Sequence, residues 1–392
     1  MTEWREFKLG DICTIIQYGY TESATFDPVG PKFLRITDIV PNIIDWSTVP
    51  YCKIDKENYE KYKLDVGDIV IARTGATTGY NKRIKDSINA VFASYLIRFK
   101  INKEIADDCF ISYVLKSDSY FGFIDNAVGG SAQPGINARV LSQFSFLLPP
   151  LPEQKAIADV LSSLDDKIDL LTRQNKTLED LAQAYFRKWF IEDASDEWEV
   201  GKAKDYFEIG IGKTPPRKEE HWFSKNNNDV VWVSISDMGK AGMFIGDSSE
   251  YLTKNAVKQF NIKRVPKGAI ILSFKLTVGR VAIALRDFTT NEAIAHFIYR
   301  NLYEREYLYF YLKTFDYYSL GSTSSIATAV NSKIIKDMPF VMPDVETLKK
   351  YHKIAAPMFS KIESNTNQIL TLQKIRDTLL PKLISGEIRV KM

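Results

Sequence analysis

The sequence FLLPPLPEQKAIADVLSSLDDKI (Phe146–Ile168) marks the point where the first half of the chain changes character. Pro149, Pro150 and Pro152 predict a helix start, because proline is tolerated where a helical N–H has no partner. Apolar residues then recur at alternating steps of four and three, which is the heptad pattern of a coiled-coil seam. The sequence therefore predicts one long helix near Glu153–Phe190.

The predicted seam of this helix is apolar at every heptad position except one asparagine: Ile157, Leu161, Leu164, Ile168, Leu171, Asn175, Leu178, Ala182, Tyr185 and Trp189. A matching seam lies 194 residues further on: Tyr351, Ala355, Met358, Ile362, Asn365, Ile369, Leu372, Arg376, Leu379 and Leu383. Two interpretations are open. Each helix could lie on its own domain, or the two helices could pack together as an antiparallel coiled coil. The length of the pattern in both halves favours the second.

The chain as a whole is an internal duplication. WREFKLGDICTI begins at Trp4 and WEVGKAKDYFEI begins at Trp198, 194 residues later. Further pairs follow in the same order: FLRITDI (33–39) with WVSISDM (232–238), VGDIVIARTGATTG (66–79) with KGAIILSFKLTVG (267–279), VFASYLIR (91–98) with AIAHFIYR (293–300), and INARVLSQFSFLLPP (136–150) with VNSKIIKDMPFVMPD (330–344). A repeat of this length must be recognised before any fold is assigned, because each copy is one structural unit.

Each half has the same internal order. A segment rich in β-branched and aromatic runs with glycine breaks predicts several short strands, and a proline-marked exit leads into the long helix. We expect an α+β protein with two similar globular domains, residues 1–150 and 193–344, separated by two spacer helices, residues 151–192 and 345–392. If the helices pack antiparallel, a pseudo-two-fold axis relates the two domains.

The amino-acid composition excludes several classes of protein but does not identify the function. Of the 392 residues, 45% are hydrophobic and 26% are charged, and the net charge is +3, which is typical of a folded protein with no overall basic character. The three cysteines form no CxxC pair and the three histidines are scattered, so we expect no metal site. The N-terminus does not resemble a signal peptide, and no apolar run approaches the roughly 18 residues that span a bilayer. We expect a cytoplasmic protein.

Two kinds of loop carry candidate DNA contacts, because reading a duplex needs cationic and amide groups on loops that can enter a groove. IGKTPPRKEEHWF (211–223) is bounded by glycine and proline and is rich in cations. Its counterpart in the first half, YGYTESATFDPVGPK (18–32), lacks those cations. This difference is expected if the two halves of the chain recognise different DNA sequences. ARTGATTGYNKR (72–83) is a polar turn after a strand, and it lacks the GxxxxGK[ST] pattern of a phosphate-binding loop. Each loop could instead be an ordinary solvated turn.

The candidate DNA-binding residues lie in these loops, in their counterparts and in the RITDI and SISDM segments. In the first half they are Tyr20, Thr21, Arg35, Thr37, Arg73, Thr74, Thr77, Tyr80 and Lys82. In the second half they are Lys213, Thr214, Arg217, Ser234, Ser236, Lys275, Thr277 and Arg280.

The chain resembles the specificity subunits of type I restriction–modification systems. The resemblance rests on GKTPP followed by VVWVSISDM, on DIVIARTGATTG, on GGSAQPGINARVL (129–141), and above all on the proline-then-helix segment Phe146–Ile168. It covers both halves. The second half departs from the family pattern, because PDVETLKKYHKIAAPMFSKI (343–362) replaces the PLPEQ segment.

The resemblance implies that each globular domain is a target recognition domain that reads one half of a split DNA site. It implies that the helices set the distance between the half-sites and bind two modification subunits, which hold S-adenosylmethionine and methylate adenine. Restriction subunits would add translocation and cleavage that depend on ATP and Mg²⁺. The chain itself would have no catalytic residue, no metal and no cofactor.

Two other classes of protein are alternatives to this interpretation. A self-contained methyltransferase needs a glycine-rich cofactor loop and an NPPY-like motif, and a nuclease needs paired carboxylates with a lysine; the sequence offers neither set. A coiled-coil adaptor that binds proteins instead of DNA is the second alternative. An adaptor would show no preference among duplexes in a mobility-shift experiment with the modification subunit present.

Overall fold

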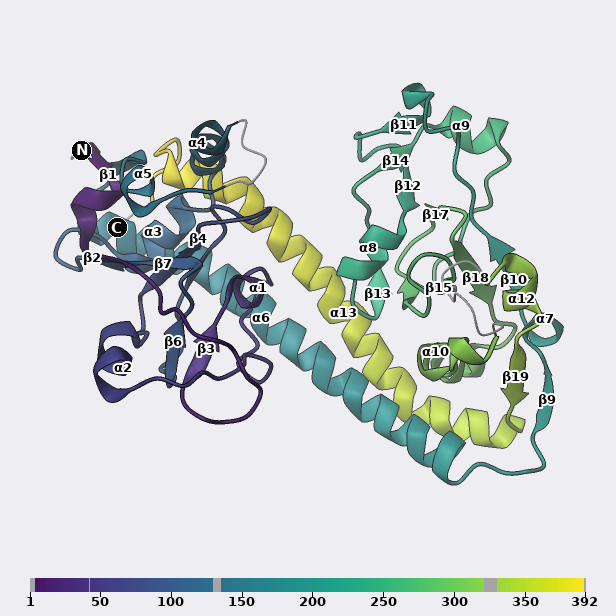
Figure 1. The fold of residues 1–392 in the computed structure, drawn as a ribbon. Helices are drawn as coiled ribbons and strands as arrows, with labels where there is room; N and C mark the ends of the chain where they lie inside the picture. The colour runs from purple at the N-terminus through teal and green to yellow at the C-terminus, as the bar shows by residue number, and fades with distance from the viewer. Residues whose placement is uncertain (1–3, 42, 130–134, 321–329, 391–392) are drawn as a thin grey trace. The chain divides into compact units, whose positions relative to one another are not determined.

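The computed structural model describes residues 4–41, 43–129, 135–320 and 330–390. The chain divides into two units (Figure 1): unit 1 comprises residues 1–169 and 370–392, and unit 2 comprises residues 170–369. Two long helices, α6 (Leu151–Arg187) and α13 (Val345–Ile384), contribute residues to both units. Each unit therefore contains one globular part and a section of each long helix. Part of the GGSAQPGINARVL segment, residues 130–134, lies outside the described residues.

Unit 1 is built on a four-stranded antiparallel sheet in the order β2-β7-β4-β5. Its strands are β2 (Cys13–Tyr18), β7 (Leu96–Ile101), β4 (Ile69–Ala72) and β5 (Asn81–Arg83). Two strand pairs flank it: antiparallel β1 (Arg5–Lys8) with β8 (Ser145–Leu148), and parallel β3 (Lys32–Leu34) with β6 (Ala90–Phe92). The helices are α1 (Ile36–Ile39), α2 (Lys56–Tyr62), α3 (Asp108–Val114), α4 (Asp118–Val128) and α5 (Ala138–Leu141).

Unit 2 repeats this plan with one more strand, in the order β10-β18-β15-β16-β13. These are β10 (Glu208–Ile211), β18 (Ile294–Ile298), β15 (Ile270–Ser273), β16 (Val281–Ala284) and β13 (Phe244–Ile245). The flanking pairs are antiparallel β9 (Glu199–Lys202) with β19 (Pro339–Met342), and parallel β12 (Val230–Val233) with β17 (Thr289–Thr290), which β14 (Tyr251–Leu252) and β11 (Phe223–Ser224) extend. The helices are α7 (Ala203–Tyr206), α8 (Ile235–Lys240), α9 (Lys254–Gln259), α10 (Arg305–Thr314) and α12 (Ser332–Lys336).

The shared strand order confirms the duplication that the sequence predicts, and two pairs of glycines repeat with it. Gly67 and Gly268 precede the matching strands β4 and β15 with φ of 96° and 86°. Gly79 and Gly279 close the turns that follow, with φ of 88° and 92°. Glycine adopts positive φ without the steric penalty of a Cβ atom, so each pair marks one backbone conformation kept in both copies.

The PLPEQ motif fixes the start of α6. Gln154 is fully buried, and its Nε2 donates to the carbonyls of Pro149 (2.8 Å) and Ile105 (3.2 Å). Its Oε1 accepts the backbone N–H of Asp107 (2.8 Å), which is the residue that caps α3. A buried polar group is retained only where its hydrogen bonds are satisfied, so this glutamine ties the helix start to two neighbouring segments.

A tryptophan–carboxylate contact occurs at the same place in both halves. In unit 1 the Trp4 indole donates to Glu153 (3.3 Å), which also accepts from Arg389. In unit 2 the Trp198 indole donates to Asp344 (3.3 Å). The second half therefore keeps this contact although it lacks the PLPEQ motif.

The two long helices run antiparallel where they pack together. In unit 2 the Tyr351 hydroxyl donates to the Ala182 carbonyl (3.0 Å), and Asn365 donates to Asn175 (2.9 Å). In unit 1 Arg376 pairs with Asp165 (2.8 Å). The alternative of two unrelated surface helices is therefore wrong.

The seam is buried over most of its length. Ile157, Leu161, Ile168, Leu171, Ala182, Tyr351, Ala355, Ile362, Asn365 and Leu383 are buried, and Leu164, Leu178, Ile369, Leu372 and Leu379 are half-buried. The prediction fails at Tyr185, which is 37% exposed, because its neighbour Phe186 takes the inward position. Phe186 packs against Tyr307, Phe310 and Tyr351 in the core of unit 2, and a π-helical turn, Lys188–Glu192, then ends α6.

Candidate DNA interface

The reading loop predicted in the second half is built on a buried tryptophan. The Trp232 indole lies on β12 and donates to the backbone carbonyl of Lys213 (3.2 Å), so the strand holds the loop that precedes it. The Arg217 guanidinium covers this indole (4.6 Å) and the ring of Phe223 (4.3 Å). Stacking on two aromatic rings restricts the rotamers of a long side chain and places its charge at the surface.

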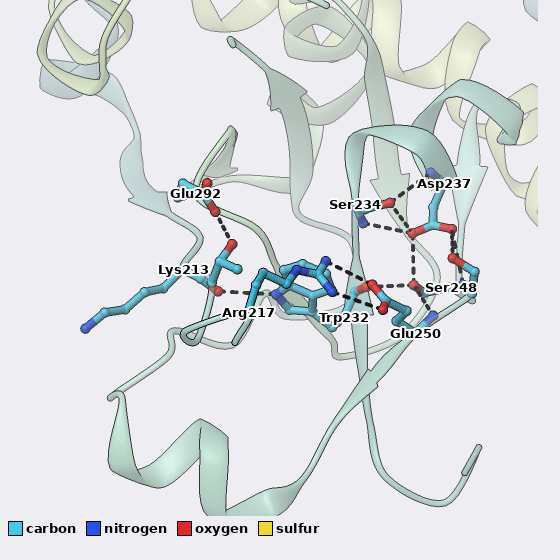
Figure 2. Close-up of polar contacts among 10 residues, drawn as sticks. Lys213, Arg217, Trp232, Ser234, Asp237, Ser248, Glu250 and Glu292 are labelled. Atoms are coloured by element: carbon cyan, nitrogen blue, oxygen red, sulfur yellow. Dashed lines mark hydrogen bonds and ion pairs between the residues drawn. The ribbon is translucent and has the colours of Figure 1, made fainter. Parts of the chain in front are cut away.

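Glu250 completes the position of Arg217. The two carboxylate oxygens accept from Nη1 and Nη2, each at 3.0 Å, in the parallel fork that Figure 2 shows. Both side chains are exposed, so the ion pair by itself adds little stability. Its effect is geometric: the same fork can meet guanine O6 and N7 when DNA competes with Glu250.

Lys213 and Thr214 belong to the same loop but point elsewhere. The Lys213 side chain extends away from Arg217 and Trp232 (Figure 2), and its Nζ donates to the Phe260 carbonyl (2.8 Å). The Thr214 hydroxyl donates to Glu292. The structure therefore brings Arg217 onto the tryptophan, while Lys213 and Thr214 tie the start of the loop to Phe260 and Glu292.

Ser234 acts as a helix cap. It precedes α8, and its hydroxyl donates to Asp237 Oδ2 (2.7 Å), which also accepts the Ser234 backbone N–H (2.9 Å) and the Ser248 hydroxyl (2.9 Å). Burial raises the pKa of Asp237, but these hydrogen bonds outweigh it and the net pKa is lowered. The hydroxyl of Ser234 is thus engaged within the protein, whereas Ser236 is exposed on the first turn of α8.

The turn after β15 carries the other predicted residues of unit 2. Lys275 and Thr277 are exposed at its tip. Arg280 is half-buried and donates from Nη1 to the Ile235 carbonyl in α8 (2.7 Å). Arg280 therefore connects this turn to the helix that carries Ser236 and is a bracing residue in this structure.

In unit 1 the predicted residues gather around the end of β2. The Arg73 guanidinium lies over the Tyr18 ring (5.0 Å), and the Arg73 N–H donates to the Tyr95 carbonyl (3.0 Å). The Tyr20 N–H donates to the Phe92 carbonyl (2.8 Å), which joins the start of the loop to the same β6–β7 connection. Thr21 follows it and is exposed.

The turn after β4 places three further predicted residues. Thr74 forms an isolated backbone bridge with Gly135, and the Thr77 carbonyl accepts the backbone N–H of Tyr80 (2.9 Å). The Tyr80 ring is exposed and meets the edge of Phe121 (6.1 Å). Backbone hydrogen bonds therefore hold Thr74 and Thr77 in the turn, and the Tyr80 ring is anchored on Phe121.

Arg35 and Lys82 are held in different ways. Arg35 forms a fork with Asp38 through Nε and Nη2, both at 3.0 Å, at the start of α1, and Thr37 is exposed beside it. The Lys82 Nζ donates to the Pro41 carbonyl (2.7 Å). Lys82 lines a cleft with Tyr113, Lys116 and the acidic residues of α6, so it does not extend toward solvent with the turn. Burial in this cleft lowers the pKa of Lys82 to about 8.

Comparison with known proteins decides the family. A model described as "Type I restriction modification DNA specificity domain" matches residues 1–180 and again residues 195–375. The chain belongs to this family of type I DNA specificity proteins. The two matches coincide with the two copies of the repeat.

Known relatives of this specificity chain agree with that assignment. The type I restriction enzyme MjaIX specificity subunit of Methanocaldococcus jannaschii is 28% identical over 84% of this chain and 77% of its own length. The HindI specificity subunit of Haemophilus influenzae is 24% identical over 99% of this chain and its entire length. The crystal structure of an S subunit from M. genitalium covers 99% of this chain and 96% of its own, with a TM-score of 0.57 and 16% identity, which shows a shared fold.

The described part of this specificity chain has neither a metal cluster nor a membrane helix. In residues 4–41, 43–129, 135–320 and 330–390, no three His, Cys, Asp or Glu side chains come together as metal ligands. Within the same ranges, no helix combines the length and apolar character required to cross a membrane.

Three strongly exposed side chains with large apolar groups, on loops of the two units, were not among the predicted residues. Phe26 lies in the cation-poor loop of unit 1, Tyr95 lies on the β6–β7 connection beside Arg73, and Leu276 lies between Lys275 and Thr277. An aromatic residue inside a glycine- and proline-bounded loop was a usable signal for Phe26, because such a loop has no core for the ring to enter.

Proposed function

We propose that this specificity chain reads a bipartite duplex site, with the loops of unit 1 on one half-site and those of unit 2 on the other. The observation that supports this most strongly is that the two units share a strand order but carry different residues on their loops. The two sheets have the same strand order and repeat their positive-φ glycines. The surface of unit 2 carries Arg217 stacked on Trp232, whereas the surface of unit 1 carries Arg73 stacked on Tyr18.

Base reading follows from the chemistry of these groups. An arginine that presents two parallel N–H donors pairs with guanine O6 and N7 in the major groove. Threonine and tyrosine hydroxyls, and exposed lysines, suit phosphates or single base acceptors, so they position the protein on the duplex. Because the two units carry different sets of these groups, they would read different sequences.

The two long helices serve as the spacer between half-sites in this proposal. Their antiparallel packing would relate the units by a pseudo-two-fold axis, which matches the two-fold relation of DNA strands. They would also bind two modification subunits, which contribute S-adenosylmethionine and methylate adenine. Restriction subunits would contribute ATP- and Mg²⁺-dependent cleavage, and this cytoplasmic chain would contribute no catalytic group.

The decisive experiment is methylome sequencing of a host with and without this chain, in the presence of its modification subunits. We expect adenine methylation that depends on the chain and falls at two half-sites with a fixed gap. The proposal fails if methylation is unchanged when the chain is removed. A mobility shift that shows equal binding to all duplexes would favour the adaptor alternative.

A further inference from the structure

One backbone position has a positive φ in both units but carries a different residue. The third residue after β4 is Gly75, with φ of +80°, and the third residue after β15 is Leu276, with φ of +63°. Glycine adopts this conformation freely, whereas leucine is strained in it. Unit 2 therefore carries a large apolar residue where its duplicate carries the residue that the backbone prefers.

The turn around Leu276 is braced and does not depend on the leucine side chain. The Thr277 N–H donates to the Lys275 carbonyl (2.7 Å), so Leu276 is the central residue of a three-residue turn with positive φ. The Ser273 hydroxyl donates to the Thr277 carbonyl (2.5 Å) and accepts the Arg280 N–H (3.1 Å). Strain of this kind persists only where surrounding bonds fix the conformation, and it concentrates at functional sites.

Leu276 is also the most exposed large hydrophobic side chain among the described residues, at 80% of its full area. The strain therefore cannot be explained by core packing. It is flanked by Lys275 and Thr277, which are exposed as well. A cation and a hydroxyl on either side of an apolar tip suit a surface that alternates phosphates with apolar base edges, as a DNA groove does.

We propose that Leu276 makes an apolar contact with DNA bases in the half-site of unit 2, while Lys275 and Thr277 contact the adjacent backbone. This inference rests on the proposed function. The contact has two possible sources: the methyl group of a thymine in the major groove, or the faces of a base step that the leucine opens. Both bury an apolar side chain that water surrounds in the free protein.

The test uses the full chain with its modification subunits and the duplex that this complex selects from a random pool. Leu276→Gly and Leu276→Asn both tolerate positive φ, so they remove the apolar tip without adding strain. We expect each to weaken binding to the selected duplex by about 10- to 100-fold, the effect of burying one leucine side chain. Leu276→Met should restore most of the affinity, and the melting temperature of Leu276→Gly should not fall.

Leu302→Ala is the matched control, because Leu302 is an exposed leucine of unit 2 on another element and should bind as the wild type does. Replacing each thymine by uracil should weaken wild-type binding at one position if the methyl group is the contact. If the leucine opens a base step, 2-aminopurine fluorescence should rise at that step only with the wild type. Binding of Leu276→Gly within twofold of the wild type would overturn the proposal. A wild-type complex that selects no duplex would instead refute the proposed function.

Discussion

Asn365 of α13 donates from its Nδ2 to the Oδ1 of Asn175 on α6, 2.9 Å away, at a seam position where apolar residues are expected. The same Nδ2 also donates a hydrogen bond to Gln174 Oε1 (2.8 Å). Asn365 is fully buried, and its Oδ1 has no hydrogen-bond partner in the part of the chain that the structure describes. A buried polar residue in a coiled-coil seam costs stability and selects one register, because any other register leaves its amide unpaired.

The first prediction follows from that cost. Asn365→Leu should raise the free energy of unfolding by about 1 kcal/mol, measured by urea denaturation, because it removes an unsatisfied buried oxygen. It should also allow methylation at sites whose gap differs from the preferred one. Asn367→Leu, on the exposed side of α13, is the control and should change neither property. A loss of stability in Asn365→Leu would contradict the cost, and methylation confined to the preferred gap would show that the asparagine is not a register device.

The second prediction concerns the length of the helices. Seven residues inserted into both α6 and α13, opposite each other beside Asn175 and Asn365, preserve the heptad pattern and add about 10 Å. We expect the gap between half-sites to lengthen by about three base pairs, read by methylome sequencing. The same insertion in α6 alone shifts one seam against the other, so this control should lower the melting temperature. An unchanged gap in the double insertion would rule out a spacer role.

Much of the repeated domain structure and of the long helices could be predicted from the sequence, because both depend on local and periodic residue patterns. The duplication, the proline-marked helix starts and the inward positions from Ile157 to Ala182 depend only on residue spacing. The loops could not be predicted in the same way, because their partners lie far away in sequence. Nothing near Arg217 indicates that Glu250 holds it, and nothing near Lys82 indicates its place in a cleft against α6.

The third prediction concerns the buried imidazole of His296. His296 lies on β18 and shares a hydrogen bond with the Thr290 hydroxyl (2.5 Å), and burial together with the charge of Lys263 lowers its pKa to about 4. The unfolded chain takes up a proton near pH 6.5 and the folded chain does not, so stability is complete above pH 6.5 and is lost toward pH 4. The loss should reach about 2 kcal/mol by pH 5.

Urea denaturation, monitored by tryptophan fluorescence, tests the predicted loss of stability at low pH. The difference in unfolding free energy between pH 7.5 and pH 5 should shrink by about that amount in His296→Gln. His221→Gln, at an exposed position, should keep the wild-type difference. An equal pH response of wild type and His296→Gln would contradict the assignment.

The fourth prediction tests the modularity of the two units. Replacing residues 2–145 with the same segment of a relative exchanges the loops of unit 1 and its strands β1 to β7, but keeps most of β8 and all of α6 and α13. We expect only one half-site of the methylated sequence to change. The reciprocal exchange of residues 199–338 should change the other half-site. A change in both half-sites after a single exchange would mean that the units do not read DNA independently.

The fifth prediction concerns the fork that Arg217 presents. Arg217→Lys keeps the positive charge but loses the two parallel donors and the planar stacking on Trp232. We expect it to weaken binding to the selected duplex by about 1–3 kcal/mol and to relax the preference at one base pair, because one bidentate contact accounts for that much discrimination. Lys218→Ala, in the same loop, should instead weaken binding to all duplexes alike and reduce the salt dependence by about one phosphate contact. Mobility shifts across a set of singly substituted duplexes at two salt concentrations separate these outcomes. Equal weakening of all duplexes by Arg217→Lys would reduce Arg217 to a backbone contact and leave base reading in unit 2 to the turn after β15.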